Sequence, residues 1–431
     1  MPQVSARDHL ETSLERISDP RGEGARACIT LYAAGARAAA DAADARARSG
    51  QSLGPLDGRV VAIKDLFDIT GETTRAGSTV LRDSPPAKAD APVVQRLRAA
   101  GAVIVAKTNM SEFAFTAFGI NPHFGTPGNP ADRSRVPGGS SSGSAVAAAD
   151  GMCDIGIGSD TGGSCRIPAA LCGIVGYKPS KFRVPTDGAF PLSYTLDSIG
   201  PLARSVRDCA AADAVMAGEQ PWTVEPTSLA GLRFGVAQGL PLGDMDATVQ
   251  SRFASAIAAL GRAGGRLSDE KLPILDAPAR VQAKASFSSV ESYAIHRQLL
   301  TAHSADYDPM VRGRIEAGRD VSAADYIEML RRRAELVREM DQRLSGLDAL
   351  IMPTVPIVAP KIAEVSNTEK ARPTNLLLLR NPALANFFDL CSISLPLPRD
   401  GGLPVGLMLF ARNGQDHNLF RIAAAIEHLF A

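Results

Sequence analysis

A strand–helix–strand pattern near residue 100 places the strongest constraint on how this chain folds. Residues 59–64 (RVVAIK) and 101–107 (GAVIVAK) are apolar runs rich in β-branched residues, and residues 91–100 between them have a helical pattern. Strands joined through a helix run parallel, because the helix carries the chain back along the sheet. The pattern therefore predicts an α/β fold with crossover helices.

The same alternation continues toward the C-terminus. Further strands are predicted at 153–158, 232–237, 348–352, 392–396 and 403–410, and further helices at 142–150, 247–263, 278–304, 322–345 and from 416. Residues 1–50 predict a helical N-terminal region, and the strongly helical block 270–345 predicts a lid-like subregion. About 150 residues per domain would divide 431 residues into two or three domains, and one large α/β core fits that length equally well.

The composition excludes several classes of protein. The 46 basic and 46 acidic residues cancel, so we expect neither nucleic acid nor a membrane as a partner. A hydrophobic share of 45% and a charged share of 21% are typical of globular proteins. The N-terminal segment lacks the apolar core of a secretory signal, and no apolar run approaches about 18 residues. We therefore expect a cytoplasmic protein.

The six cysteines and six histidines show no metal-binding pattern. The cysteines include no CxxC pair and are not spaced with the histidines as zinc ligands are. In a chain of this length they predict reduced and mostly buried thiols. We expect no metal and no other cofactor.

Two loops rich in glycine and serine are the candidate site of chemistry. Residues 137–144 (PGGSSSGS) and 159–164 (SDTGGS) are linked by one helix and one strand, so both loops can reach the same edge of the sheet. Lys64 ends its own strand, and open α/β sheets bind ligands at the carboxyl edge. A buried lysine can lose its proton and activate a serine hydroxyl, while consecutive glycines can turn backbone N–H groups toward an oxyanion. These residues suit serine acyl transfer.

Several alternative roles of the same residues stay open at this point. Gly/Ser loops often serve only as turns and helix caps, and a lysine at a strand end is often solvated. Residues 61–64 (VAIK) resemble the lysine strand of kinases, but HRD and DFG motifs are absent. Residues 139–143 satisfy G-x-S-x-G, although a loop rather than a strand precedes them. The same loop suits a phosphate, although the P-loop lysine is missing.

Lys64 and the two loops together resemble the amidase signature family. The segments PGGSSSGSA (137–145) and SDTGGSCRIPA (159–169) carry the resemblance, which is strong over residues 55–205 and weaker at 352–360 and 402–409. The resemblance implies one amidase domain over residues 1–431, with 55–205 as its signature core. It also implies a single large mixed, mostly parallel β-sheet covered by helices on both faces.

The resemblance further implies a Ser–cis-Ser–Lys triad. Ser164 corresponds to the nucleophile that forms an acyl-enzyme, Ser140 to the bridging serine on a cis peptide bond, and Lys64 to the base. The family's oxyanion hole corresponds to the backbone N–H groups of Thr161, Gly162, Gly163 and Ser164.

Neighbouring residues are assigned supporting or binding roles. We expect Asp160, Arg166 and Gly139 to support the two loops, and Cys165 to pack rather than to react. Met110 and Phe115 are candidates for the substrate pocket. Residues 386–391 (NFFDLC) stand where many relatives have a smaller, glycine-containing segment beside the pocket, so the pocket is expected to differ there.

Four functions follow as hypotheses. The first is an amidase that hydrolyses the C–N bond of a small-molecule amide and releases ammonia or an amine. The second is the amidase subunit of a tRNA-dependent amidotransferase, and the third is a urea or carbamate hydrolase with the same triad. The fourth is a non-catalytic or phosphate-binding protein, which requires a protonated and exposed Lys64. Similar proteins commonly dimerise through the N-terminal helical region, so we also expect a homodimer.

Overall fold

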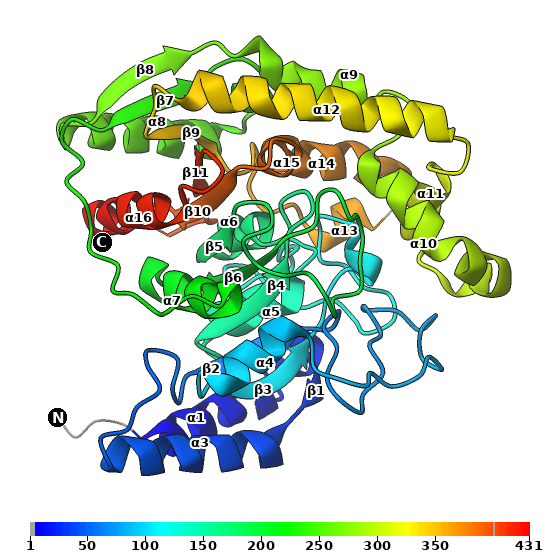
Figure 1. The fold of residues 1–431 in the computed structure, drawn as a ribbon, viewed down its shortest axis with the longest axis vertical. Coiled ribbons are helices and arrows are strands. Elements are labelled where there is room, and N and C mark those ends of the chain that lie inside the picture. The colour runs from blue at the N-terminus through cyan, green and yellow to red at the C-terminus, as the bar shows by residue number, and fades with distance from the viewer. Residues whose placement is uncertain (1–4, 367, 400) are drawn as a thin grey trace.

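One β-sheet runs through the whole chain. The computed structural model describes residues 5–366, 368–399 and 401–431, and the strands within these ranges form a single sheet of eleven in the order β1-β3-β2-β4-β6-β5-β10-β11-β9-β7-β8 (Figure 1). The strands are β1 (Cys28–Leu31), β2 (Val60–Lys64), β3 (Val103–Thr108), β4 (Ile155–Ser159), β5 (Val175–Lys178), β6 (Ile199–Ala203), β7 (Arg233–Ala237), β8 (Arg266–Glu270), β9 (Ala349–Pro353), β10 (Cys391–Pro396) and β11 (Gly406–Ala411).

The predicted α/β fold with one mixed sheet is confirmed, and the share of parallel pairing needs correction. Among the described strands, four neighbouring pairs are parallel and six are antiparallel, so the sheet is not mostly parallel. The antiparallel pairs include the middle run β4-β6-β5-β10-β11-β9. Between β10 and β11 the chain has only residues 397–405, which is too short for the crossover that parallel strands need.

The predicted strand–helix–strand unit is confirmed. The strands β2 and β3 pair in parallel, and the helix α4 (Pro92–Ala99) connects them. Lys64 is the last residue of β2, and Ser159 is the last residue of the neighbouring parallel strand β4. Both side chains therefore start from the same carboxyl edge of the sheet.

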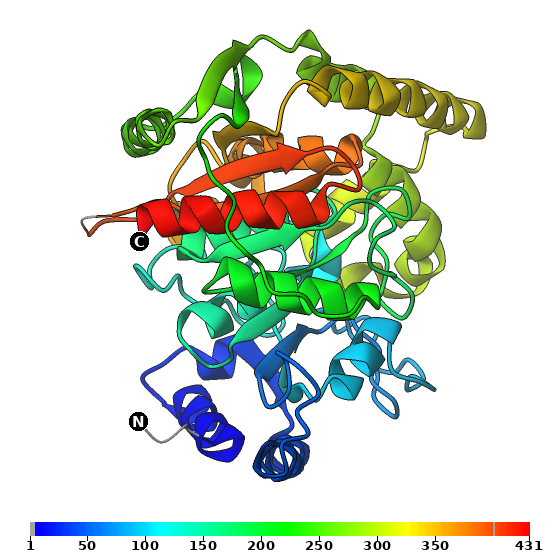
Figure 2. The same ribbon diagram turned by 60° about the vertical axis from the view of Figure 1, so that its left-hand side comes forward.

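Helices cover both faces of the sheet, and each face has its own hydrophobic core. Along β2, Val61 and Ile63 join the core under α4, α7 (Val206–Ala217) and α16 (Asp416–Phe430), which lie together across one face (Figure 2). Val60 and Ala62 join the core under α1 (Ala6–Ser18), α3 (Ala33–Arg48) and α5 (Ser142–Ala149). Because both faces are covered, the strand is a continuous apolar run.

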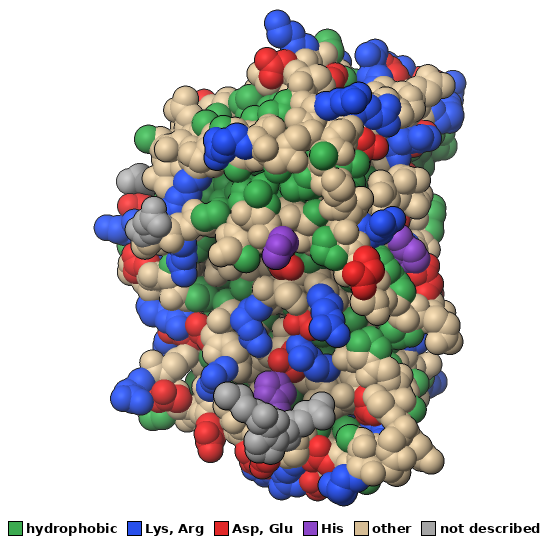
Figure 3. Space-filling view, turned by 90° about the vertical axis from the view of Figure 1, so that its left-hand side faces the viewer, with side chains coloured by type: hydrophobic (Ala, Val, Ile, Leu, Met, Phe, Trp, Pro, Cys, Tyr) green, Lys and Arg blue, Asp and Glu red, His purple; other side chains and the backbone are tan. Residues whose placement is uncertain are grey.

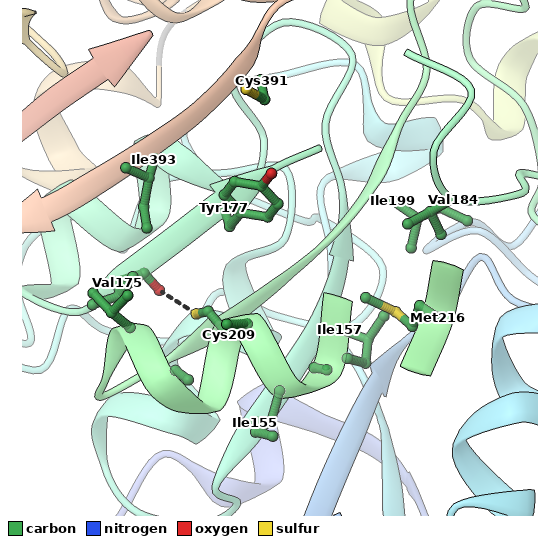
Figure 4. Packing of buried hydrophobic residues seen from close by; sticks show 14 of the residues in the cluster. Ile155, Ile157, Val175, Tyr177, Val184, Ile199, Cys209, Met216, Cys391 and Ile393 are labelled. Atoms are coloured by element: carbon green, nitrogen blue, oxygen red, sulfur yellow. Dashed lines mark hydrogen bonds between the residues drawn. The ribbon is translucent and has the colours of Figure 1, made fainter. Parts of the chain in front are cut away.

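Figure 4 shows part of the first core. Ile157 of β4 lies beside Met216 of α7, and the Cys209 thiol of the same helix donates to the Val175 carbonyl at 3.8 Å. All four side chains are buried. This packing supports β4, the strand that ends at the second Gly/Ser loop.

The N-terminal region is less helical than predicted. Between α1 and α3 lie a short helix, α2 (Gly24–Ala27), and the strand β1, which pairs antiparallel with β3. The residues of β1, CITL, include two β-branched side chains beside the open edge of the sheet. Edge pairing thus outweighs the helical composition on either side.

The block between β8 and β9 consists of helices, as the sequence predicts. Its elements are η3 (Pro273–Asp276), α9 (Ala277–Val281), α10 (Phe287–His303), η4 (Ser304–Asp306), α11 (Pro309–Glu316) and α12 (Ala323–Leu344). Figure 1 shows α12 lying along α14 and α15, with α10 and α11 at one side of the molecule. The remaining helical elements are η1 (Glu112–Ala114), α6 (Arg166–Cys172), η2 (Leu240–Leu242), α8 (Ala247–Arg262), α13 (Ile362–Val365), α14 (Thr368–Arg380) and α15 (Pro382–Phe387).

The surface agrees with the balanced charge of the sequence. In Figure 3, acidic and basic side chains lie interspersed over the lower half of the visible face. Among the described residues, no helix is both long enough and apolar enough to cross a membrane.

Candidate active site

Lys64 is buried beneath the two Gly/Ser loops. Its Nζ lies 2.7 Å from Ser140 Oγ, 3.0 Å from Ser141 Oγ and 2.9 Å from Ser159 Oγ. The side chain is fully buried, and this burial lowers the pKa of Lys64 to about 7, although nearby groups that include Cys165 and Asp160 oppose the shift. A lysine with such a pKa is partly neutral at physiological pH and can accept a proton.

Ser140 is joined to Gly139 by a cis peptide bond, as the resemblance implies. The N–H of Gly139 donates to the Ala117 carbonyl at 2.7 Å, and the N–H of Ser111 donates to the Ser140 carbonyl at 3.1 Å. A Cβ atom at position 139 would lie 2.6 Å from the Gly119 nitrogen and 2.8 Å from Ser111 Oγ. The loop therefore has room only for glycine at this position.

A buried ion pair holds the second loop. Arg166 Nη2 lies 2.8 Å from Asp160 Oδ1, and both side chains are fully buried. Although burial by itself would raise the pKa of Asp160, the charge of Arg166 and the hydrogen bonds from Arg166 and Asn386 lower that pKa to about 2. Asp160 is thus a permanent anion at the base of the loop.

Asn386 completes this support. Its Nδ2 donates to Asp160 Oδ1 at 2.9 Å, and its Oδ1 accepts a hydrogen bond from Arg166 Nη2 at 2.8 Å. In the sequence, residues 386–391 differ from the segment that many relatives have beside the pocket. In the structure, neighbouring residues of this segment have different roles. Asn386 faces the ion pair, whereas the next residue, Phe387, lines the pocket.

The carboxylate of Asp160 also contacts the backbone of the predicted oxyanion hole. It accepts hydrogen bonds from the N–H of Gly163 at 2.8 Å and the N–H of Cys165 at 3.1 Å. The N–H of Gly163 is therefore already engaged by a hydrogen bond within the loop. Within the described ranges, no hydrogen bond engages the backbone N–H of Thr161, Gly162 or Ser164, and these three remain the candidates.

Ser164 stands at the wall of a cavity of about 350 Å³. The side chain is nearly buried, with 5% of its surface exposed, and its carbonyl accepts a hydrogen bond from the N–H of Ser141 at 3.3 Å. This bond joins the two loops. The other lining residues are mostly apolar and include Phe115, Leu192, Leu196, Leu379 and Phe387.

The two predicted pocket residues differ in position. Phe115 lines the cavity. Met110 is fully buried in the hydrophobic core and is not among the described residues that line the cavity. The prediction that Met110 belongs to the pocket is therefore wrong. Its side chain packs against Gly77, where an added Cβ would come within 2.8 Å of Met110 Cγ.

Three residues of the site were not predicted from the sequence, although the strand pattern could have identified one of them. Ser159 ends β4 directly beside the end of β2, so the strand pattern points to a contact with Lys64. Ser141 is predicted only as a loop residue, yet it contacts the same amine. Arg314 of α11 lines the cavity, although it lies 150 residues after Ser164 and belongs to no local motif.

The remaining predictions concern cysteine and metal chemistry. Cys165 is fully buried, burial raises the pKa of its thiol, and the thiol donates to the Gly200 carbonyl at 3.4 Å. These contacts fit the predicted packing role. In the described part of the chain, no group of three or more His, Cys, Asp or Glu side chains is placed to hold a metal ion.

Known proteins match this chain over nearly its whole length. It is 36% identical to 2-amino-5-chloromuconic acid deaminase from Comamonas testosteroni, over 93% of this chain and 87% of the relative. It is 35% identical to a glutamyl-tRNA(Gln) amidotransferase subunit from Anaeromyxobacter sp. (strain K), over 98% and 93%. The crystal structure of an amidase superimposes with a TM-score of 0.89 at 34% identity, over 99% of this chain and 97% of that one.

The match to a family is equally broad. The family model described as Amidase covers residues 8–420, which include Lys64, both Gly/Ser loops and the cavity. The relatives at about 35% identity span these same regions. The chain therefore belongs to the amidase signature family of hydrolases.

Proposed function

We propose that this protein is an amidase that hydrolyses the C–N bond of a small-molecule amide through an acyl-enzyme on Ser164. The observation that carries the proposal is the 2.7 Å contact between Lys64 Nζ and Ser140 Oγ beside a cavity lined by Ser164. A buried amine with a pKa of about 7, a bridging hydroxyl and a serine at a cavity wall are the parts that a proton relay needs.

The hydrogen bonds around Lys64 suit a neutral amine. Ser141 donates its own O–H to the Ser159 carbonyl at 3.2 Å, so toward Lys64 it acts as an acceptor. A neutral amine has two hydrogens and one lone pair. It can donate to Ser141 and Ser159 and accept the proton of Ser140, which directs the lone pair at the bridging serine.

In the first half of the reaction, Ser164 Oγ attacks the amide carbon. Its proton passes to Ser140 Oγ while the Ser140 proton passes to Lys64 Nζ. The N–H groups of Thr161, Gly162 and Ser164 stabilise the oxyanion. The C–N bond then breaks, the nitrogen takes a proton back through Ser140, and ammonia or an amine leaves. In the second half, water gives its proton to the same relay and attacks the ester carbon, which restores Ser164 and releases the carboxylic acid.

The alternatives predict different properties of the same site. A phosphate-binding protein requires an exposed, charged lysine, whereas Lys64 is fully buried and its pKa is lowered. An amidotransferase subunit requires glutaminase activity and a stable partner, which purification and a glutaminase assay test. A urea or carbamate hydrolase would use the same relay, and a substrate panel separates it from an amidase.

The experiment that tests the proposal is active-site labelling followed by intact-mass measurement. We expect a small fluorophosphonate to add once to the wild type, not at all to Ser164→Ala, and slowly to Lys64→Ala. Ser142→Ala is the matched control, because Ser142 lies in the same loop as Ser140 and its Oγ has no hydrogen-bond partner among the described residues. An adduct that survives in Ser164→Ala, or a folded wild type that forms no adduct, would contradict the proposal.

Two further expectations concern the assembly. We infer that residues 1–431 form one domain, which is supported by the single sheet that contains strands from Cys28 to Ala411. Limited proteolysis that released a stable fragment would contradict this. The homodimer stays a prediction, and light scattering of the purified protein tests it.

A further inference from the structure

Arg314 places a cation in the wall of the cavity that Ser164 lines. It belongs to α11, and its Nη1 is buried without a hydrogen-bond partner among the described residues. Its Cζ lies 4.7 Å from the centre of the Phe115 ring, which lines the same cavity. The ring supports the guanidinium from one side and does not provide an acceptor for Nη1. Arg314 as a whole is half-buried, and a buried guanidinium nitrogen without a partner is unfavourable unless a ligand supplies an acceptor.

The surroundings of Arg314 are positive. Burial and the like charge of Arg372 lower the pKa of Arg314 to about 10. A second hollow of about 500 Å³ adjoins the cavity at Arg314 and is lined by Arg372. Lys284 also lines this hollow, but Asp325 at 2.7 Å balances its charge, so among the described residues the unpaired positive charge here is that of Arg372 and Arg314. The potential along this hollow therefore favours the approach of an anion.

The described lining of the cavity has no carboxylate that would balance a cation. Among the described residues, no aspartate or glutamate lines either the cavity or the adjoining hollow. The other arginine of the cavity, Arg380, is already paired with Asp244 at 3.0 Å. An ammonium group in this space would lose its hydration and face Arg314 without a counter-charge.

We propose that Arg314 binds a carboxylate of the substrate, so that the substrates are amides that carry a free carboxylate and no neighbouring ammonium group. The proposal rests on the proposed amidase function and names its substrate class. A guanidinium binds a carboxylate through two parallel N–H···O bonds, which fixes the acid end of the substrate while the amide end lies at Ser164. The apolar walls of the cavity, to which Leu376 and Leu379 contribute, suit a short carbon chain.

The kinetic test compares acidic and neutral amides of equal length. Half-amides of straight-chain dicarboxylic acids, from malonamate to adipamate, are assayed for ammonia release beside their methyl esters. We expect kcat/KM for the best half-amide to exceed that of its ester by about 10- to 100-fold, because hydrogen bonds to charged groups are the stronger class. In Arg314→Met this ratio falls to about one. Equal values for acid and ester in the wild type would overturn the proposal.

Arg312→Met is the matched control for the arginine substitution. Arg312 lies on the same helix and donates a hydrogen bond to the Ser304 carbonyl at 3.1 Å. It is not among the described residues that line the cavity. We expect the acid-to-ester ratio of this variant to match the wild type. A ratio that falls equally in Arg312→Met and Arg314→Met would mean that helix α11 has been disturbed, and would overturn the assignment to Arg314.

A binding measurement separates this inference from the proposed function. In Ser164→Ala, which cannot turn over, calorimetry should show binding of the best half-amide and at least tenfold weaker binding when Arg314→Met is added. Glutamine should bind at least tenfold more weakly than glutaramate, because it adds an ammonium group. Unchanged affinity in the double variant, or tight glutamine binding, overturns the carboxylate site. Selective binding without turnover and without a Ser164 adduct would instead overturn the amidase function.

Discussion

Lys64 Nζ and Ser140 Oγ lie 2.7 Å apart in a space where both side chains are fully buried. The lysine comes from the end of a strand and the serine from a loop 76 residues later. Burial lowers the pKa of the amine to about 7, so the same contact that positions the proton acceptor also makes it partly neutral. This pair and the loops that hold it decide how the protein should respond to pH and to substitution.

The activity should depend on the protonation of Lys64. Because the relay needs the neutral amine, kcat/KM should rise with pH through about 7 and level off above it, as for one ionisation. The rate constant rises, rather than falls, because the amine loses its proton as pH rises. Lys64→Arg should lose at least about 100-fold in kcat/KM at every pH, because a guanidinium stays charged. A profile that is flat from pH 6 to 8 would contradict the role of Lys64.

The bridging serine should matter without being the nucleophile. Ser140→Ala should slow labelling of Ser164 by about 10²- to 10⁴-fold, because the proton loses its path to Lys64. The intact-mass measurement used for the labelling experiment follows this rate directly. A variant that is labelled as fast as Ser142→Ala would show that protons leave Ser164 by another route.

The ion pair between Asp160 and Arg166, at the second Gly/Ser loop, should stabilise the fold. Asp160→Asn leaves Arg166 buried without its counter-charge, so the free energy of unfolding should fall by about 3–5 kcal/mol in urea denaturation. In the wild type, the contribution of Asp160 is present above the ordinary aspartate pKa and is lost as pH falls through about 2. Glu328→Gln removes an exposed partner of Arg331 and should change stability by less than about 1 kcal/mol. Equal effects of the two substitutions would contradict this prediction.

Gly139 should not tolerate a side chain. In Gly139→Ala the new Cβ would meet the Gly119 nitrogen at 2.6 Å, so the free energy of unfolding should fall by about 1–3 kcal/mol and Ser164 labelling should slow. Gly35→Ala is the control, because a Cβ at that helical position meets nothing within 4 Å. That control should gain up to about 1 kcal/mol from helix propensity. Unfolding curves and labelling rates that match the wild type in Gly139→Ala would show that the loop can move aside.

Much of the site could be predicted because its residues lie in short, ordered segments. The apolar runs indicate β2, β3 and β4, and the ends of these strands place Lys64 near the two serine loops. The motif spacing within those loops then identifies Ser140 and Ser164 by resemblance to the family. Local composition was less reliable at the N-terminus, where β1 forms because an open sheet edge is available to pair with it.

Other features required the tertiary structure because they join distant segments. Gly163 looks free to bind an oxyanion until the carboxylate of Asp160 is placed under its N–H. Asn386 looks like a pocket residue until its amide is seen between Asp160 and Arg166, which lie more than 200 residues earlier.

By itself, therefore, the sequence determined the alternation of strands and helices and the two Gly/Ser loops, and its resemblance to the family predicted the Lys64, Ser140 and Ser164 group. Periodicity and short motifs carry that information within a few residues. Only the tertiary structure decided the antiparallel centre of the sheet, the burial that lowers the pKa of Lys64, and the place of Arg314 in the cavity wall. These depend on which distant surfaces pack together and exclude water, and no local pattern records that choice.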